Sequence, residues 1–391
     1  MTARVALLIS CIAVATPAAA QSSLLPRLSG GAAPGFTLWS LSDPVAQASG
    51  NVTGLSQFSV PLRGRAMLGR WTFDASAAFA SARAEFEDAE GETRTLSLSG
   101  ITDLRLRARV PVAGDGVVLT AGVNVPTGTT KLDADETAVL QLVGAPALRM
   151  AVPALGLGFG ATLGVVAARQ AGPWAIAVGA SVEERAEYTP IEVALAGSTQ
   201  ATSIDPGFAT HLTVGADRTV GAHRLAVLLV GDVYGKDALA DSQDEDASVE
   251  YTLGPSVTGL ARMDLGLGGW REASAEASVR LRSAFKDGDG AKVEGSNGTY
   301  VEMSVTGVRG APYSRGLVLG VDALWHSGID ATDAMVGAAA ALGGVTVGLD
   351  LPMNGYALRV TVRAQAGSMD TGTTKFNATG LTLTAALGTQ R

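Results

Sequence analysis

The residues best suited to chemistry are charged side chains that recur at every second position. Between residues 270 and 285, Glu272, Glu276, Arg280 and Arg282 hold even positions, and apolar residues hold most of the odd ones. Even and odd positions of an extended strand lie on opposite faces of a sheet. The pattern therefore predicts one charged face and one apolar face. A charged face of this kind could bind ions or polar solutes, or pair with charges of the opposite sign on neighbouring strands.

A second charged row is strongly basic. Arg105, Arg107 and Arg109 follow Asp103 at alternate positions, with apolar residues between them. Like charges on one strand face repel each other, so we expect these three arginines to have an anionic partner. Arg359 and Arg363 form a similar row near the end of the chain. We predict that all these charges face the same enclosed space, where ion pairing between neighbouring strands is favoured over solute binding.

Nucleophilic catalysis has little support in the sequence. The chain has three His residues, and one of them, His326, precedes Ser327 and lies near Asp330. A hydrolytic site needs a His beside such groups, so a hydrolase remains the third functional alternative. The acidic run from Asp287 to Gly290 lacks the terminal Glu of a calcium-binding loop. We therefore predict no catalytic, cofactor-binding or metal-binding residues and no cofactor.

Composition favours one large β architecture. The chain has 391 residues, 49 Gly, one Cys and 17% charged residues, and its mean hydropathy is +0.25. A transmembrane β-barrel explains a high hydropathy without spanning helices, because apolar residues are spread over one face of many strands. The net charge of −8 excludes the basic surface that nucleic-acid binding requires.

Residues 1–20 are predicted to be a signal peptide. Arg4 supplies the positive start, Val5 to Val14 the apolar segment, and Ala18 to Ala20 the small-residue cleavage site. A lipoprotein signal around Cys11 is a weaker alternative. Cleavage near Ala20 would remove Cys11, the only cysteine, and leave a chain with net charge −9.

Alternation and connection length together predict sixteen antiparallel strands in an up-and-down transmembrane barrel. The predicted strands cover 36–42, 52–62, 70–86, 94–112, 117–127, 155–169, 174–188, 206–219, 223–235, 248–264, 269–285, 298–309, 316–327, 334–350, 355–367 and 376–388. Barrels of 14 strands, or of 12 strands with residues 21–50 as an N-terminal plug, are the alternatives. Residues 51–391 are predicted to form the transmembrane barrel, and residues 21–50 are either its first strand or a plug. Short and long connections alternate, which places the long ones outside the cell.

Three local features qualify this pattern. Within 71–86 the alternation changes phase near Ala78, which predicts a β-bulge. Residues 151–168 carry no charge and are long enough for a membrane helix, but Pro153 and four Gly favour a loop and a strand. Residues 128–154 are the longest predicted external loop, which either stays outside the barrel or folds into it.

Aromatic residues gather near the predicted strand ends, where membrane interfaces favour their amphipathic rings. Three begin strands after short turns and predict an inner interfacial belt: Trp71, Trp174 and Trp270. Others lie near the long loops and predict an outer belt: Tyr188, Tyr234, Tyr251, Tyr300 and Trp325.

The stretch from Gly100 to Gly128 resembles a known family. Its Gly100-Ile101-Thr102-Asp103-Leu104 segment and its Gly122-Val123-Asn124-Val125-Pro126-Thr127-Gly128 segment are similar to motifs of the outer-membrane proteins associated with phenol meta-pathway degradation, distantly like long-chain fatty-acid channels. Asn124 stands where that family commonly has Lys. The resemblance implies a passive channel for hydrophobic or aromatic solutes.

A bacterial outer-membrane barrel would contact the lipid bilayer, lipopolysaccharide and its small solutes, with no nucleic acid. A structural or surface barrel without a transport role is the second functional alternative. The oligomeric state does not follow from the sequence.

Overall fold

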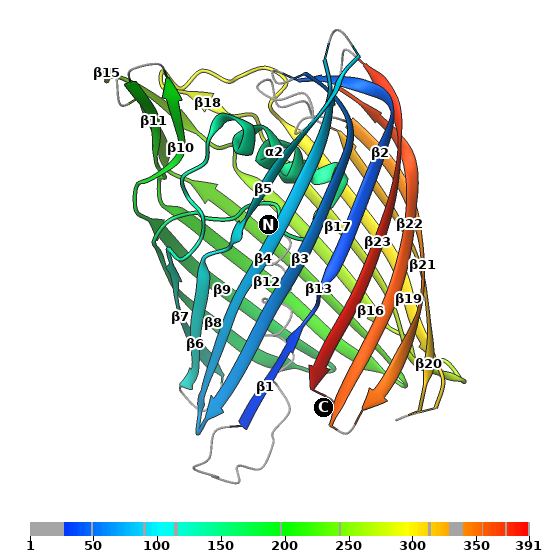
Figure 1. Cartoon of the computed structure of the whole chain (residues 1–391). Coiled ribbons are helices and arrows are strands. Elements are labelled where there is room, and N and C mark those ends of the chain that lie inside the picture. Colours follow the sequence, from blue (N-terminus) through cyan, green and yellow to red (C-terminus); the bar gives the residue numbers. More distant parts are fainter. Residues whose placement is uncertain are drawn as a thin grey trace.

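The computed structural model describes residues 27–47, 50–88, 91–112, 116–195, 198–241, 244–311, 314–327, 339–353, 355–371 and 374–389. The predicted signal peptide and its cleavage site lie outside these residues. The described chain forms a closed antiparallel barrel of sixteen strands (Figure 1), as predicted. Two of the sixteen strands are interrupted, so they appear as the pairs β1–β2 and β5–β6.

The first interrupted strand closes the barrel. β1 and β2 pair with β3 on one side and with the last strand, β23, on the other. Residues 27–47 are therefore part of the barrel wall. The strands of the barrel, in order around the ring, are β1 Arg27–Ala32 with β2 Gly35–Gln47, β3 Gly50–Leu68, β4 Trp71–Glu87, β5 Thr93–Ile101 with β6 Leu104–Val112, β7 Val117–Val125, β8 Gly160–Ala171, β9 Trp174–Arg185, β12 Ala209–Val220, β13 His223–Tyr234, β16 Ser256–Asp264, β17 Trp270–Arg282, β19 Gly298–Arg309, β20 Gly316–Ser327, β21 Ala339–Met353, β22 Tyr356–Asp370 and β23 Lys375–Thr389.

Short connections gather at one end of the barrel, which we call the turn end (Figure 1). Three of them are two-residue turns whose first residue is a glycine with positive φ: Gly69 at 57°, Gly172 at 59° and Gly221 at 60°. Hairpins of this length need positive φ to match the twist of their strands, and glycine adopts it without a steric penalty. The chain's C-terminal strand also ends at this end.

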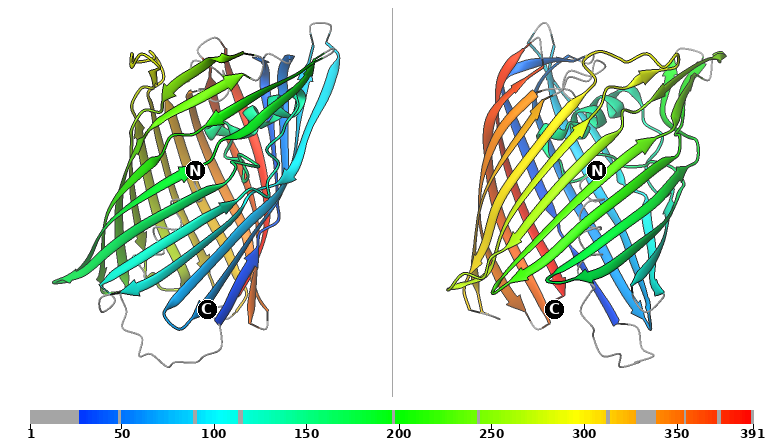
Figure 2. Two further views of the ribbon diagram at one scale, coloured as in Figure 1. Left: turned by 90° about the vertical axis from the view of Figure 1, so that its left-hand side faces the viewer. Right: turned by 180° about the vertical axis from the view of Figure 1, so that it is seen from behind.

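Long connections gather at the opposite end, the loop end, where they build a second sheet above one side of the barrel (Figures 1 and 2). This external sheet contains β10 Tyr188–Leu195, β11 Ser198–Asp205, β14 Lys236–Asp241, β15 Asp244–Thr252 and the short β18 Lys286–Asp287. The strand predicted over 248–264 is therefore divided between this sheet and the barrel. Pro255 lies at the break, where it cannot donate a ladder hydrogen bond.

The outer face of the barrel is apolar. Large aliphatic side chains are exposed at alternate positions on most strands, among them Leu163, Val178, Leu229, Val305 and Val345. A water-soluble monomer rarely exposes such a continuous apolar surface, whereas a bilayer requires one. No helix within the described residues is long and apolar enough to cross a membrane. The charge-free segment 151–168 is an extended connection followed by β8.

The buried core lies inside the loop-end half of the barrel. The connection between β7 and β8 folds into the lumen instead of outward, and it carries the helix α2 Ala134–Gly144 and the single turn η1 Pro146–Leu148. We call residues 128–157 the inserted segment. Its Val139, Leu142 and Leu148 pack with Trp39 and Phe86 of the barrel wall in one apolar cluster.

This insertion explains the phase change near Ala78. The predicted β-bulge is not in β4, which keeps continuous register with β3 across Ala78. The extra residue lies in the neighbouring strand opposite Ala78, where the pairing of β4 passes from β6 to β5. Beyond Ala78 the inward residues of β4, from Ala80 to Phe86, are apolar because the inserted segment covers them. The alternation thus reverses in polarity while the strand geometry stays regular.

Candidate functional site: the lumen and its inserted segment

The predicted charged rows lie on the inner face of the barrel. Arg105 and Arg107 alternate with the exposed, outward Leu106, and Arg280 and Arg282 alternate with the exposed, outward Leu281. The same alternation turns the remaining members of the rows inward: Arg109, Glu272, Glu276, Arg359 and Arg363. The barrel therefore encloses a lumen that is lined with charge.

Lumenal acids near the turn end are exposed to solvent. The side chains of Glu272 and Glu276 are 56% and 46% exposed, although both point into the barrel. A carboxylate can stay this exposed inside a closed barrel only if the surrounding space holds water, because burial of a charge is costly. The turn-end half of the lumen is therefore aqueous.

Most charges on the β12–β22 side of the lumen form ion pairs. Arg262 contacts Asp264 at 2.8 Å and Glu276 at 2.5 Å, and Arg359 contacts Glu272 at 2.9 Å. The Arg262–Glu276 pair connects the neighbouring strands β16 and β17, as the sequence predicted for an interior filled by acidic and basic rows. The Arg262–Asp264 pair lies within β16, and the Arg359–Glu272 pair joins β22 to β17, which are not adjacent in the ring.

A β-bulge in β17 brings two consecutive charged residues into this ion-pair network. The register between β17 and β19 shifts between Trp270 and Glu272. As a result Arg271 and Glu272 both reach inward, where Arg271 contacts Asp350 and Arg359 bridges Glu272 and Asp350. Trp270 lies on the outer face against Gly307, where a Cβ would come within 2.6 Å of the indole ring.

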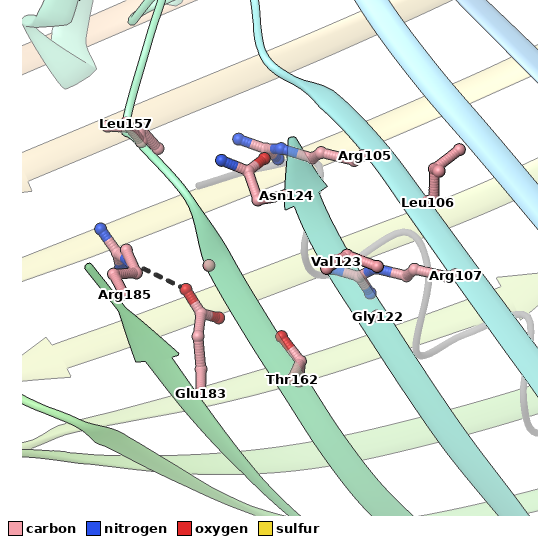
Figure 3. A pocket seen from close by; sticks show the side chains of 11 residues that line it. Arg105, Leu106, Arg107, Gly122, Val123, Asn124, Leu157, Thr162, Glu183 and Arg185 are labelled. Atoms are coloured by element: carbon pink, nitrogen blue, oxygen red, sulfur yellow. Dashed lines mark hydrogen bonds and ion pairs between the residues drawn. The ribbon is translucent and has the colours of Figure 1, made fainter. Parts of the chain in front are cut away.

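The basic row of β6 has an anionic partner in Asp74 at its turn-end position. Arg109 contacts Asp74 at 2.5 Å, and Asp74 also contacts Arg65 at 2.6 Å. Arg105 and Arg107 lie further toward the loop end and line a pocket in the barrel wall. We call this the arginine pocket; its lining residues are Arg105, Leu106, Arg107, Gly122, Val123, Asn124, Leu157, Gly160, Thr162, Glu183 and Arg185 (Figure 3).

A histidine links the arginine pocket to the next strands. His211 Nδ1 lies 2.7 Å from an Asp232 carboxylate oxygen, and its Nε2 lies 3.9 Å from Glu183. Ser256 Oγ donates to the other oxygen of Asp232 at 2.9 Å. Because Asp232 lies between Ser256 and His211, these hydrogen bonds do not pair a nucleophile with a base. The sequence singled out neither His211 nor Asp232, since each is an isolated polar residue in its strand.

Asp103 does not line the open lumen; it fastens the inserted segment to the wall. Its side chain is buried at the break between β5 and β6. Oδ1 accepts the backbone N–H of Gly128 at 2.9 Å, and Oδ2 accepts the backbone N–H of Leu157 at 2.7 Å and Asn124 Nδ2 at 2.8 Å. Gly128 begins the inserted segment and Leu157 ends it. One carboxylate therefore holds both ends.

The positions of Gly100, Thr127 and Gly128 have a structural explanation in these contacts of Asp103. Thr127 Oγ1 accepts the backbone N–H of Leu104 at 2.9 Å. A Cβ on Gly128 would lie 2.7 Å from Asp103 Oδ1, and a Cβ on Gly100 would lie 2.3 Å from Thr129 Oγ1. Both glycines are needed because the segment enters the barrel in direct contact with the wall.

The inserted segment crosses the lumen. Trp39 Nε1, on the first strand, donates to the carbonyl oxygen of Leu148 at 2.8 Å. Gln57 donates to the carbonyl of Val152 at 2.8 Å and accepts its N–H at 3.1 Å. On the opposite wall, Arg149 contacts Asp322 of β20 at 2.6 Å and also Glu302 of β19. Contacts to both walls fix the segment across the pore.

Local sequence explains why the segment contains a helix. Asp133 accepts the backbone N–H of Glu136 at 2.8 Å, and Glu136 accepts the backbone N–H of Asp133 at 3.2 Å. This reciprocal capping box satisfies donors that a helix start leaves unpaired. Arg149 then adopts a left-handed conformation with φ of 50°, which ends the helical turn and directs its guanidinium toward the far wall.

The residues of the predicted aromatic belts lie on different surfaces of the barrel. Trp71 and Trp325 are exposed on the outer face, and Trp174 lies at the turn end with Arg218 stacked 5.5 Å from its ring. Tyr300 does not face lipid: its hydroxyl donates to Glu302 at 3.1 Å in the lumen. Tyr234 shares the inward face of β13 with Asp232.

The remaining two belt residues, Tyr188 and Tyr251, belong to the external sheet. Asp237 accepts a hydrogen bond from Tyr251 and one from the backbone N–H of Gly207 at 2.7 Å. Burial raises the pKa of Asp237 above its ordinary value, and burial beside Asp237 raises the pKa of Tyr251 to about 12.

The structure offers no support for hydrolysis at His326. The imidazole is buried on the lumenal face, with its ring 6.2 Å from the ring of Tyr300. Ser327 lies on the opposite face of the strand, and Asp330 lies outside the described residues. Asp287 Oδ1 accepts the backbone N–H of Ala291 at 2.8 Å and so closes a turn. Within the described ranges, no group of three His, Cys, Asp or Glu could hold a metal ion.

No family model matches the chain, and no curated protein matches its sequence, so the resemblance to the phenol-degradation family is not confirmed. The solved structures similar to this chain include outer-membrane channels. Pseudomonas aeruginosa OccK2, solved in complex with glucuronate, is 10% identical over 93% of this chain and 96% of its own, with a TM-score of 0.47. Pseudomonas putida OprB, in its low-pH structure, is 8% identical over 92% of each chain, with a TM-score of 0.44.

The outer-membrane channel DcaP of Acinetobacter baumannii is 11% identical over 94% of this chain and 98% of its own, with a TM-score of 0.42. At these identities and TM-scores the likeness is weak. The chain itself forms a closed sixteen-strand barrel with a charged lumen crossed by an inserted segment.

Proposed function

We propose that the chain is a passive channel of the bacterial outer membrane that admits small, water-soluble solutes. The observation that carries the proposal is the exposure of Glu272 and Glu276 inside a closed barrel of sixteen strands. Barrels of this size are wide enough to leave an aqueous passage. The inserted segment narrows that passage at the loop end and would set the size limit for solutes.

The outer membrane is the location that suits such a barrel. Its apolar outer face supports contact with lipid, and the predicted signal peptide supports export. We propose that the turn end faces the periplasm and that the external sheet faces lipopolysaccharide, because outer-membrane barrels have short periplasmic and long external connections. We assign no enzymatic role.

The preference for hydrophobic or aromatic solutes that the family resemblance implies stays a prediction. The side chains that line the described lumen, such as Arg107, Glu276 and Arg363, are charged. Charged and hydrated walls lower the barrier for polar solutes and offer apolar ones little contact surface. The lumen therefore supports the broader class of small polar solutes.

Planar-bilayer conductance and liposome swelling test this proposal. We expect stepwise ionic conductance, and swelling rates in neutral sugars that fall steeply with sugar size. Protein-free liposomes are the control. If the folded barrel gives neither conductance nor solute flux, the chain is a structural or surface barrel and the channel proposal is wrong.

A further inference from the structure

The arginine pocket is built by strand register. The pairing of β6, β7, β8 and β9 aligns Arg105, Asn124, Gly160 and Arg185 in one row across the wall. The next row toward the turn end contains Arg107, Gly122, Thr162 and Glu183 in the same way. Arginines therefore border the pocket on both sides, from β6 and from β9 (Figure 3).

Small residues on the two central strands keep the space between these arginines open. A Cβ on Gly122 would lie 3.4 Å from Arg107 Cγ, and a Cβ on Gly160 would lie 3.2 Å from Arg185 Cγ. The arginine stems thus lie close over the glycines. Larger side chains there would push the guanidinium groups away from the wall and fill the pocket.

The pocket has a positive balance of charge. Among the described residues that line it, three are arginines and one, Glu183, is an acid, which contacts Arg185 at 2.9 Å. Asp103 lies at the loop-end margin, where N–H groups of the inserted segment surround its carboxylate. Even with Asp103 counted, basic groups outnumber acidic ones here, although the whole chain carries a net charge of −8.

The other side of the lumen is different. Arg262 has two carboxylates within 2.8 Å, and Asp322 is shared by Arg149 and Arg363. Acids and bases compensate each other there. The positive balance is thus local to the wall beside the inserted segment, where the passage is narrowed.

We propose that the arginine pocket binds the carboxylate of small organic acids as they pass the inserted segment. A guanidinium group offers two parallel N–H donors that match the two oxygens of a carboxylate. Arg105 and Arg107 would contact the carboxylate from β6 and Arg185 from β9, while Glu183 orients Arg185 through their 2.9 Å contact. This inference rests on the proposed channel and specifies its solute class.

Planar-bilayer recordings at low salt compare the wild-type barrel with Arg107→Gln. Propionate is the probe, and propionamide is its uncharged counterpart of nearly the same shape. We expect propionate to reduce chloride current saturably and propionamide to have no such effect. We expect Arg107→Gln to weaken the propionate effect about threefold, the change produced in water by one unit charge at roughly 7 Å. The chloride-over-potassium permeability ratio should fall by more, because the lost charge acts on the two ions in opposite directions.

Arg83→Gln is the matched control, because Arg83 lies on the exposed outer face of β4 and the substitution removes the same charge. It should leave both measurements unchanged. If the wild-type barrel conducts but responds equally to propionate and propionamide, or if Arg107→Gln equals the wild type, the carboxylate site is wrong and the channel stands.

A second measurement separates the two proposals fully. If the wild-type barrel does not conduct, the channel proposal fails, and calorimetric titration of propionate into the barrel in detergent micelles still decides the site. Binding that Arg107→Gln weakens would support the carboxylate site, and the absence of binding would overturn it.

Discussion

At the scale of single residues, Asp103 has the clearest individual role. Its carboxylate accepts hydrogen bonds from the first and last residues of the inserted segment and from Asn124. The side chain is buried, so water cannot replace these bonds at once when the carboxylate is removed. Asp103, which the sequence predicted to line the lumen, therefore holds the inserted segment to the barrel wall.

Asp103→Ala should loosen the inserted segment. Each backbone N–H left without an acceptor costs about 1–3 kcal/mol, so we expect faster hydrogen exchange over residues 128–157 and noisier channel current. Asp103→Asn, which retains one acceptor oxygen, should give a smaller effect. Exchange rates equal to those of the wild type in Asp103→Ala would contradict this role of Asp103.

The Tyr251–Asp237 pair predicts a pH dependence at the same scale. The folded pKa of Tyr251 is raised from 10.0 to about 12, so the folded state holds the phenol proton more tightly than the unfolded state. Its stabilising contribution is complete below pH 10 and is lost as the pH rises through about 12. The protection of external-sheet amides, which is their exchange rate corrected for base catalysis, should therefore fall across this window. Tyr251→Phe should abolish this loss of protection, whereas an unchanged pH profile of protection in that variant would refute the role of Tyr251.

At the scale of elements, the inserted segment is a small folded unit held against the barrel wall. α2 packs its Val139, Leu142 and Val143 against β4 and β5, and η1 reaches β21. Apolar packing at one side and the ion pairs of Arg149 at the other keep it in one position. The width of the passage therefore depends on the stability of this unit.

Leu142→Ala should weaken the packing of α2 against β4 and β5. Loss of a buried leucine costs about 2–5 kcal/mol, so we expect larger conductance fluctuations and a higher mean conductance in planar bilayers. Gln141→Ala is the matched control, because Gln141 is exposed on the same helix. Equal conductance in the two variants would show that α2 does not limit the passage.

At the scale of the whole molecule, the barrel separates two environments across the thickness of one strand. Val305 of β19 is 49% exposed on the outer face, and the adjacent Ser304 faces the lumen between Glu276 and Asp322. Burial alone does not distinguish these surfaces, since both are accessible. We propose that the distinction lies in what contacts them, lipid on one side and water on the other.

Val305→Arg and Ser304→Arg place the same charge on these two surfaces. In a lipid bilayer, Val305→Arg should destabilise the barrel by about 2–4 kcal/mol, the cost of arginine near the membrane midplane. Ser304→Arg should cost much less, because two lumenal acids lie on the paired strands. Denaturant unfolding in liposomes measures the difference, and equal costs would contradict the assignment of the two faces.

The sequence by itself determined the barrel. Alternation is read directly along a strand, and short and long connections punctuate it, so the number of strands and most of their positions could be predicted. The same alternation identified inward charges such as Arg107, Glu276 and Arg363, since a residue's face depends only on its position in its own strand.

Only the tertiary structure decided what those charges contact. The path of the inserted segment depends on residues far apart in the chain, such as Trp39, Asp103 and Asp322, which no local pattern connects. Trp39 had one available signal: it lies beside apolar Leu38, so both faces of its strand are apolar, as expected where protein covers the inner face. Tyr300 was wrongly predicted to lie in the outer aromatic belt for the same reason. Its position near a strand end does not reveal that Arg149, in the distant inserted segment, lies beside it.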